Sequence, residues 1–266
     1  MAIKLYWCRG KGRDNASQQN FGDYLSPLIV EMLAGKPVVY SPIAKAEMMA
    51  IGSIMNRERK AKRFLLPRRL HVWGAGTDAP GLSFSGRHFY HAVRGERTRE
   101  QIDGLKSQPA LGDPGLLSAQ WWDGRPVPGK RYRIGLIPHY VDKGNPHLQQ
   151  AAALPGVKLI DVFSPVEEVL RQIQECEFVI SSSMHGLIVS DAFGVPNRRV
   201  RLSQGKVSDY KFVDYYSAFS LAEPAPLNAE DLLQLASKDP CELVGEYNRP
   251  GLDALQRGLV ESFPRL

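Results

Sequence analysis

Three serines and a histidine follow one of the most apolar segments of the sequence. Residues 178–181 are typical of a buried strand, and a short apolar helix is predicted over 185–193. Backbone N–H groups at a helix N-terminus, together with serine hydroxyls, can bind an anion. We therefore predict that Ser181, Ser182 and Ser183 bind an anionic group and that His185 lies beside it. The alternative is a serine N-cap with a packed histidine, and the spacing alone does not decide between the two.

His139 follows another predicted strand of the same half, at 132–137. The carboxyl ends of parallel strands meet at one edge of a sheet, where ligands bind. We therefore expect His139 and His185 to face one crevice. Either histidine alone is more often a packed residue, but we interpret the pair as functional.

Polar residues of the first half could face the same crevice. Asn20 and Asp23 open the first predicted helix, where they suit capping but could also hydrogen-bond a ligand across a cleft. Arg94 lies where a predicted strand passes into a helix, close to Arg97 and Arg99. Guanidinium groups bind carboxylate and phosphate, although most surface arginines are simply solvated.

The elements that must position these residues alternate between strands and helices, which indicates parallel sheets. Strands are predicted at 2–7, 38–40, 70–73, 87–93, 110–111, 132–137, 157–162, 178–181 and 198–202, and helices at 21–34, 44–56, 98–105, 164–176 and 185–193. We predict an α/β fold with two Rossmann-like domains facing a cleft. The domains are 1–124 and 125–266, joined by the proline-containing segment 121–128, and the second ends in a helical tail from about Asn228.

Composition and motifs exclude several classes of function. Lys and Arg exceed Asp and Glu by 34 to 28, which favours an anionic partner. Gly74–Ala79 matches G-x-G-x-x-A, but Pro80 prevents the helix that dinucleotide binding requires, so we predict a turn. The three cysteines are isolated and neither Asp-x-Asp nor His-Glu-x-x-His occurs, so we expect no metal and no cofactor. Nucleic-acid binding is also not expected.

The location of the protein is predicted from its N-terminus and from one basic segment. No signal peptide precedes the first strand, so we expect a cytoplasmic protein. Segment 57–69 carries basic residues at 57, 59, 60, 62, 63, 68 and 69, with apolar residues between them. This pattern is consistent with peripheral contact with an anionic membrane and equally with a solvated loop.

Taken in order, these segments resemble the polysaccharide pyruvyl transferase family, over about residues 2–220. The matching pieces are Asn20–Asp23, Ile51–Ser53, Val72–Gly76, Val93–Thr98, Leu111–Pro114, Ile137–His139, Ser181–Pro196 and Lys211–Tyr216. The resemblance is to the exopolysaccharide ketal-pyruvate branch, because Ser183 stands where other members have arginine in Arg-x-His-Gly.

The resemblance implies an architecture similar to the two-domain (GT-B-like) glycosyltransferases, with the acceptor on the N-terminal side and the donor on the C-terminal side. It also implies transfer of the enolpyruvyl unit of phosphoenolpyruvate onto two hydroxyls of a sugar, which forms a ketal and releases phosphate. On this basis His185 is the acid that protonates the donor and His139 a base. Arg94 and Lys211 bind the donor in place of the missing arginine, and Asn20 and Asp23 bind the acceptor.

Other classes of function stay open at this point. A nucleotide-sugar-dependent glycosyltransferase of the same fold would share the architecture and the basic cleft. A non-catalytic module that binds lipid or glycan is the third class, against which the two histidines at strand ends argue weakly. The sugar or lipid-linked oligosaccharide acceptor is not identified by these patterns.

Overall fold

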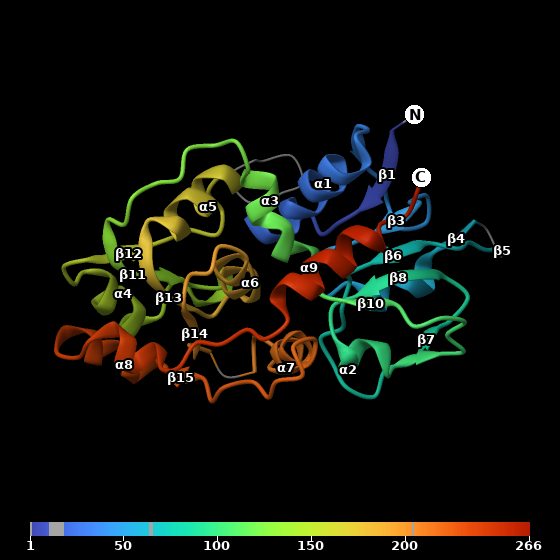
Figure 1. The fold of residues 1–266 in the computed structure, drawn as a ribbon. Coiled ribbons are helices and arrows are strands. Elements are labelled where there is room, and N and C mark those ends of the chain that lie inside the picture. The colour runs from blue at the N-terminus through green and yellow to red at the C-terminus, as the bar shows by residue number, and fades with distance from the viewer. Residues whose placement is uncertain (1, 11–18, 64–65, 204) are drawn as a thin grey trace.

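Parallel β-sheets form the framework of both halves of the chain (Figure 1). The computed structural model describes residues 2–10, 19–63, 66–203 and 205–266. The strands of the first sheet run in the order β10 (Ala110–Leu111), β8 (Phe89–Val93), β6 (His71–Trp73), β3 (Met48–Met49), β1 (Ile3–Tyr6) and β2 (Val38–Tyr40). Those of the second run in the order β12 (Val157–Leu159), β11 (Tyr132–Ile137), β13 (Cys176–Ser181), β14 (Asn197–Arg201) and β15 (Leu227–Asn228). Neighbouring strands are parallel throughout, which confirms the predicted α/β class.

Helices connect and cover these strands. The α-helices are α1 (Phe21–Ala34), α2 (Glu96–Arg99), α3 (Ser118–Trp122), α4 (Pro146–Ala152), α5 (Val166–Gln174), α6 (Met184–Ala192), α7 (Tyr210–Ser217), α8 (Pro240–Val244) and α9 (Leu252–Glu261). The 3₁₀ helices are η2 (Met55–Lys60), η3 (Pro114–Leu117), η4 (Tyr140–Asp142) and η5 (Ala229–Ala236). Short strands add the antiparallel pair β4 (Lys62–Arg63) and β5 (Leu66–Pro67) and the parallel pair β7 (Phe84–Ser85) and β9 (Ile102–Asp103).

Helix α1 begins and ends where its sequence predicts. Asn20 Oδ1 accepts a hydrogen bond from the Gly22 N–H at 3.0 Å, which satisfies one of the free donors of the first turn. Gly35 ends the helix in the left-handed conformation, at φ 59°, which glycine adopts without a steric penalty. The apolar face between these caps is fully buried at Phe21, Leu25 and Ile29.

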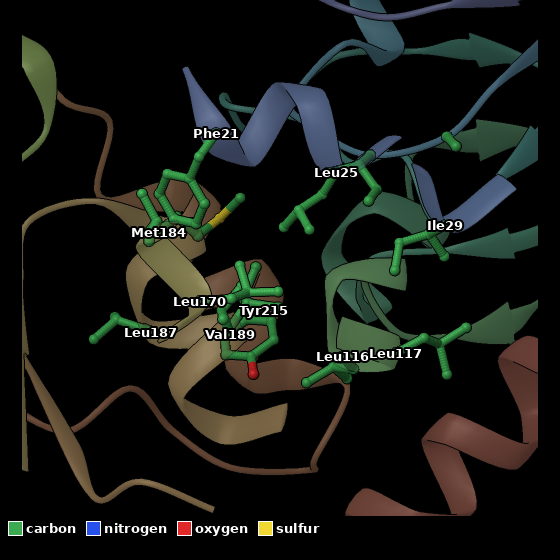
Figure 2. Close-up of a cluster of buried hydrophobic side chains, with 14 of the residues drawn as sticks. Phe21, Leu25, Ile29, Leu116, Leu117, Leu170, Met184, Leu187, Val189 and Tyr215 are labelled. Carbon is green, nitrogen blue, oxygen red and sulfur yellow. The ribbon is translucent and has the colours of Figure 1, made fainter. Parts of the chain in front are cut away.

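The hydrophobic core passes from one half of the chain to the other. Helix α6 is buried at every residue, as expected for a helix without a polar face. Figure 2 shows Phe21 of α1 beside Met184 of α6 and Leu25 pointing toward the same helix. Packing in this shared core fixes the positions of α1 and α6 relative to each other. Since α1 belongs to the first half of the sequence and α6 to the second, the core joins the two halves.

The C-terminal tail returns to the first sheet. From α8 the chain crosses to α9, which lies against the first sheet (Figure 1). Trp73 Nε1 donates a hydrogen bond to the Leu259 carbonyl at 3.0 Å, and the Trp73 and Phe263 rings meet edge to face. The division at residues 124 and 125 stays a prediction, and the structure adds that the tail of the second half packs on the first.

Two predicted helices are wrong. In place of a helix over 44–56 the chain forms β3 and then η2, because Met48 and Met49 are fully buried between β1 and β6. In place of a helix over 98–105 it forms the short α2, and Ile102 then pairs with Phe84 in β7. In both segments tertiary packing overrides local helix propensity. The turn predicted at Gly74 is confirmed, with φ 84°.

Segment 57–69 forms η2 and the β4–β5 pair, and residues 64–65 lie outside the described residues. Arg59 donates to the Ser83 carbonyl at 3.1 Å, and Arg68 donates to the Ala44 carbonyl at 2.9 Å. Two of its cations are therefore tied to backbone oxygens. Within the described part of the chain, no helix is long and apolar enough to cross a membrane.

Candidate functional site

His185 lies in the first turn of α6, beyond the carboxyl end of β13. Its side chain is buried, and its Nε2 has no hydrogen-bond partner in the part of the chain that the structure describes. A buried polar atom without a partner costs about 1–3 kcal/mol, so such atoms are rare and call for an explanation. A ligand that reaches Nε2 would supply the missing partner.

The serine hydroxyls beside His185 differ in the hydrogen bonds that they make within the protein. The single hydroxyl proton of Ser181 is shared between the carbonyl oxygens of Ile137 and Ser183, each 2.8 Å from Oγ, and Oγ accepts from the Ser183 N–H at 3.0 Å. Ser182 Oγ donates to Asp142 at 2.6 Å and accepts from the His139 N–H at 2.9 Å. The Ser183 side chain makes no hydrogen bond to cap α6. Ser181 and Ser182 therefore bind the strand ends together, and the Ser183 hydroxyl is the one left for a ligand.

His139 is half-buried at the carboxyl end of β11, next to β13. Its Nδ1 accepts a long hydrogen bond, 3.4 Å, from the Val141 N–H. This bond favours the neutral tautomer in which Nε2 carries the proton. Asp142, on the same turn, is buried and has one carboxylate oxygen without a partner among the described residues.

Helix α1 brings Gly22 and Asp23 to the same place. A Cβ atom built on Gly22 would lie 2.0 Å from His185 Nδ1, so only glycine allows the two helices to approach this closely. Asp23 follows directly and is half-buried. Burial raises the pKa of Asp23 to about 7, and Lys211 opposes the rise. Asn20 is half-buried and is engaged in the cap described above.

Lys211 projects from α7 into this group of residues. Its charge interacts electrostatically with Asp23 and Asp142. Among the described residues, however, no carboxylate oxygen lies within 4.0 Å of its Nζ, so it forms no ion pair there. Burial, together with the charges of Arg94 and Arg199, lowers the pKa of Lys211 to about 8. A half-buried ammonium group without a paired carboxylate is suited to binding an anion.

Burial, reinforced by the same cations, keeps both histidines neutral. Burial lowers the pKa of His185 to about 3, and Lys211, Arg94 and His139 add to the effect. Burial also lowers the pKa of His139 to about 4, with Lys211 adding to the effect and Asp142 opposing it. Without a bound anion, neither imidazole is protonated at pH 7.

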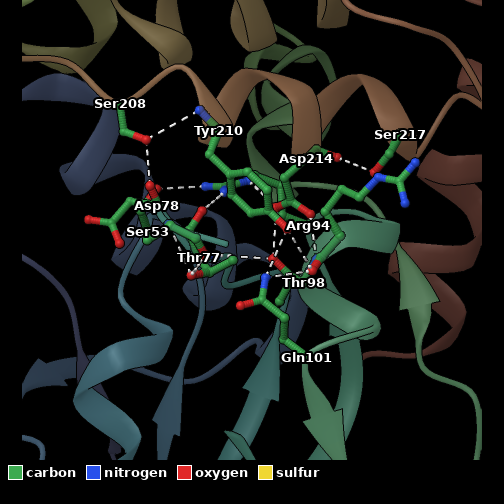
Figure 3. Close-up of polar contacts among 12 residues, drawn as sticks. Ser53, Thr77, Asp78, Arg94, Thr98, Gln101, Ser208, Tyr210, Asp214 and Ser217 are labelled. Atoms are coloured by element: carbon green, nitrogen blue, oxygen red, sulfur yellow. Dashed lines mark hydrogen bonds and ion pairs between the residues drawn. The ribbon is translucent and has the colours of Figure 1, made fainter. Parts of the chain in front are cut away.

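Arg94 is fully buried beside the site and joins the two halves of the chain (Figure 3). Its Nε pairs with Asp214 of α7 at 2.8 Å, its Nη1 donates to Ser53 at 2.8 Å, and its Nη2 donates to the Thr77 carbonyl. Asp214 also accepts from the N–H and hydroxyl of Thr98 at 2.7 and 2.8 Å. Arg94 therefore acts on the site through its charge and by holding α7 in place.

The structure brings Asp23, His139, His185 and Lys211 together, with Ser183 at the start of α6. The residues that sequence reasoning missed are Gly22, Asp142 and Asp214, which position the others. Asp142 could have been found from the sequence, because it lies three residues after His139. Asp214, the partner of Arg94, could not, because 120 residues separate the two in the sequence. In the described ranges, no group of three or more His, Cys, Asp or Glu residues is arranged to hold a metal ion.

Comparison with known proteins gives a consistent result. Residues 68–203 match the family model described as polysaccharide pyruvyl transferase. An uncharacterized protein of Acanthamoeba polyphaga mimivirus is 34% identical over 138 residues, 49% of this chain and 48% of that protein. The succinoglycan biosynthesis protein ExoV of Rhizobium meliloti (strain 1021) is 27% identical over 203 residues, 74% of this chain and 60% of that protein. The match thus spans about half of the first relative and three fifths of the second.

Proposed function

Because the chain belongs to the polysaccharide pyruvyl transferase family, we propose that it is a transferase that uses phosphoenolpyruvate as donor. It would move the enolpyruvyl unit onto two hydroxyls of a sugar, in a polysaccharide or its lipid-linked precursor, and form a pyruvate ketal. The observation that carries this proposal is the ammonium group of Lys211, which has no paired carboxylate among the described residues and lies near two neutral histidines. Phosphoenolpyruvate has a phosphate and a carboxylate, both of which need cations and hydrogen-bond donors.

We assign donor binding to the side chains whose charge or hydrogen-bonding groups are not already used by partners among the described residues. Lys211 supplies the charge, and Ser183, His139 Nε2 and His185 Nε2 supply hydrogen bonds. Ser181 and Ser182 support this group from below through their bonds to β11 and η4. Arg94 contributes through its charge.

The reaction needs one acid. Protonation of the methylene carbon gives C2 cationic character, a sugar hydroxyl attacks C2, and the C2–O bond to phosphate breaks as the second hydroxyl adds. One hydroxyl proton replaces the proton delivered to the methylene carbon, and the other leaves with phosphate. His185 is the proposed acid, because the phosphate dianion would stabilise its imidazolium and reverse the lowering of its pKa. A positioned acid contributes about 10²–10⁴-fold.

The acceptor is assigned to the side of α1, where Asn20 and Asp23 lie. The two separate parallel sheets support an architecture similar to GT-B glycosyltransferases, with domains 1–124 and 125–266, and α9 of the second half crosses back to the first sheet. Arg57, Arg69 and the other cations of segment 57–69 would allow peripheral contact with an anionic membrane that carries the acceptor.

The proposal is tested by measuring donor binding and product formation in one preparation. Calorimetric titration should detect phosphoenolpyruvate binding. Incubation with phosphoenolpyruvate and candidate lipid-linked oligosaccharides should release phosphate and add the mass of a pyruvate ketal. Binding of a nucleotide diphosphate sugar, with none of phosphoenolpyruvate, would instead identify a glycosyltransferase.

A further inference from the structure

Asp23 carries a carboxylate without a hydrogen-bond or ion-pair partner in the described part of the chain. It occupies the first turn of α1, half-buried, next to the glycine that contacts His185. Among the described residues its carboxylate makes no hydrogen bond and no ion pair, although Lys211 lies near enough to act on it electrostatically. Carboxylates held away from bulk water are normally paired, so an unpaired one beside a candidate active site indicates a role with a ligand.

The two histidines are poorly suited to removing a proton from a sugar hydroxyl. Nδ1 of His139 already accepts from the Val141 N–H, which leaves Nε2 with the proton. Nδ1 of His185 is covered by Gly22, and its Nε2 is assigned to the donor. The base must therefore come from another element, and α1 is the element on the proposed acceptor side.

We propose that Asp23 is the general base that removes the proton from the first attacking hydroxyl of the acceptor. The inference rests on the proposed function and adds a residue role to it. The hydroxyl oxygen forms its bond to C2 of the donor while its proton passes to the Asp23 carboxylate. Lys211, which interacts electrostatically with Asp23, is assigned to the donor anion, so the two charged groups serve the two substrates.

The pKa of Asp23 suits the role of a general base. Burial raises its pKa to about 7, and an efficient base has a pKa near the working pH. Lys211 of α7 is the charged group that acts on Asp23, and Asp23 in turn interacts electrostatically with Tyr6 and Cys8 at the end of β1, as Arg57 of η2 also does. Lys211 favours the carboxylate, and burial favours the acid.

The test compares Asp23→Asn with Glu31→Gln, which removes a carboxylate from an exposed position of the same helix. Asp23→Asn should keep phosphoenolpyruvate affinity within about threefold and lower turnover by about 10²–10⁴-fold. In the unaltered chain, turnover should fall as the pH drops below about 7, and Asp23→Asn should no longer show this fall. Asp23→Glu should restore part of the turnover and the acid limb, and Glu31→Gln should behave as the unaltered chain.

The outcomes separate this inference from the proposed function. If the unaltered chain does not bind phosphoenolpyruvate, the proposed function fails first. If it binds and turns over the donor, but Asp23→Asn keeps normal turnover or its acid limb, Asp23 is not the base. Loss of donor affinity, of thermal stability and of turnover together in both Asp23→Asn and Asp23→Glu would make Asp23 a structural residue of α1 and overturn the inference.

Discussion

Gly22 of α1 and His185 of α6 are in direct contact, although 163 positions separate them in the sequence and they belong to different halves of the chain. A methyl group on Gly22 would overlap the imidazole ring. Gly22→Ala should therefore shift the ring or the helix and lower turnover, at a cost in stability of about 1–3 kcal/mol. Gly129→Ala is the control, because nothing lies within 4 Å of a Cβ atom at that position. Equal turnover in the two variants would show that the contact does not position His185.

Removal of the imidazole of His185 should affect turnover more than donor binding. His185→Ala and His185→Gln should each lower turnover by about 10²–10⁴-fold, the range for losing a general acid. Donor affinity should fall much less, because Lys211 and Ser183 still contact the anion. Near-normal turnover of His185→Gln would make His185 a binding residue, and His139 would become the candidate acid.

Lys211→Met should weaken phosphoenolpyruvate binding and make it less dependent on ionic strength, since one cation no longer attracts the donor. In the unaltered chain, affinity should also decline as the pH rises past about 8, where the free Lys211 loses its proton because burial lowers its pKa to about 8. Lys206→Met removes an exposed lysine of the preceding loop and should leave affinity and its pH dependence unchanged. The same affinity and salt dependence in both variants would place Lys211 outside the donor site.

The buried pair Arg94–Asp214 should matter more for stability than the exposed pair Arg97–Glu100, whose side chains are 47% and 55% exposed. Asp214→Asn leaves the Arg94 charge buried without its partner, which typically costs about 3–5 kcal/mol. Glu100→Gln should change the free energy of unfolding by less than about 1 kcal/mol. Urea unfolding of both variants measures the difference, and a similar small change in each would contradict a structural role for the buried pair.

His185 should make the chain less stable as the pH falls below about 6.5, because burial lowers its pKa to about 3 in the folded chain, whereas Asp23, whose pKa burial raises to about 7, acts in the opposite direction. Between about pH 3 and pH 6.5 the unfolded chain binds a proton on His185 that the folded chain does not, so through this residue acid favours unfolding. Lowering the pH from 7 to 5 should therefore change the unfolding free energy less unfavourably in His185→Gln than in the unaltered chain. His147→Gln, at the start of α4, serves as the histidine control. An unchanged loss in His185→Gln would indicate that His185 titrates normally in the folded chain.

The sequence by itself determined the α/β class, most of the strands, and the residues at strand ends. The periodic apolar positions of α1 and its caps at Asn20 and Gly35 are local features, so they could be predicted without a fold. The serines and His185 were placed correctly at the end of β13 for the same reason, since a buried strand followed by an apolar helix is visible in a short window.

Only the tertiary structure decided which of these residues face one another and in which state. Met48 and Met49 form a strand because β1 and β6 flank them, and no local pattern reveals that. Partners from distant segments use the hydrogen-bonding groups of Ser181, Ser182 and Arg94. The Ser183 hydroxyl and the Lys211 ammonium group remain able to bind a ligand. The proton affinities of Asp23 and His185 likewise follow from burial and from charges on other elements. Desolvation and long-range pairing depend on contacts between segments far apart in the chain, so the residue types and their spacing could not supply them.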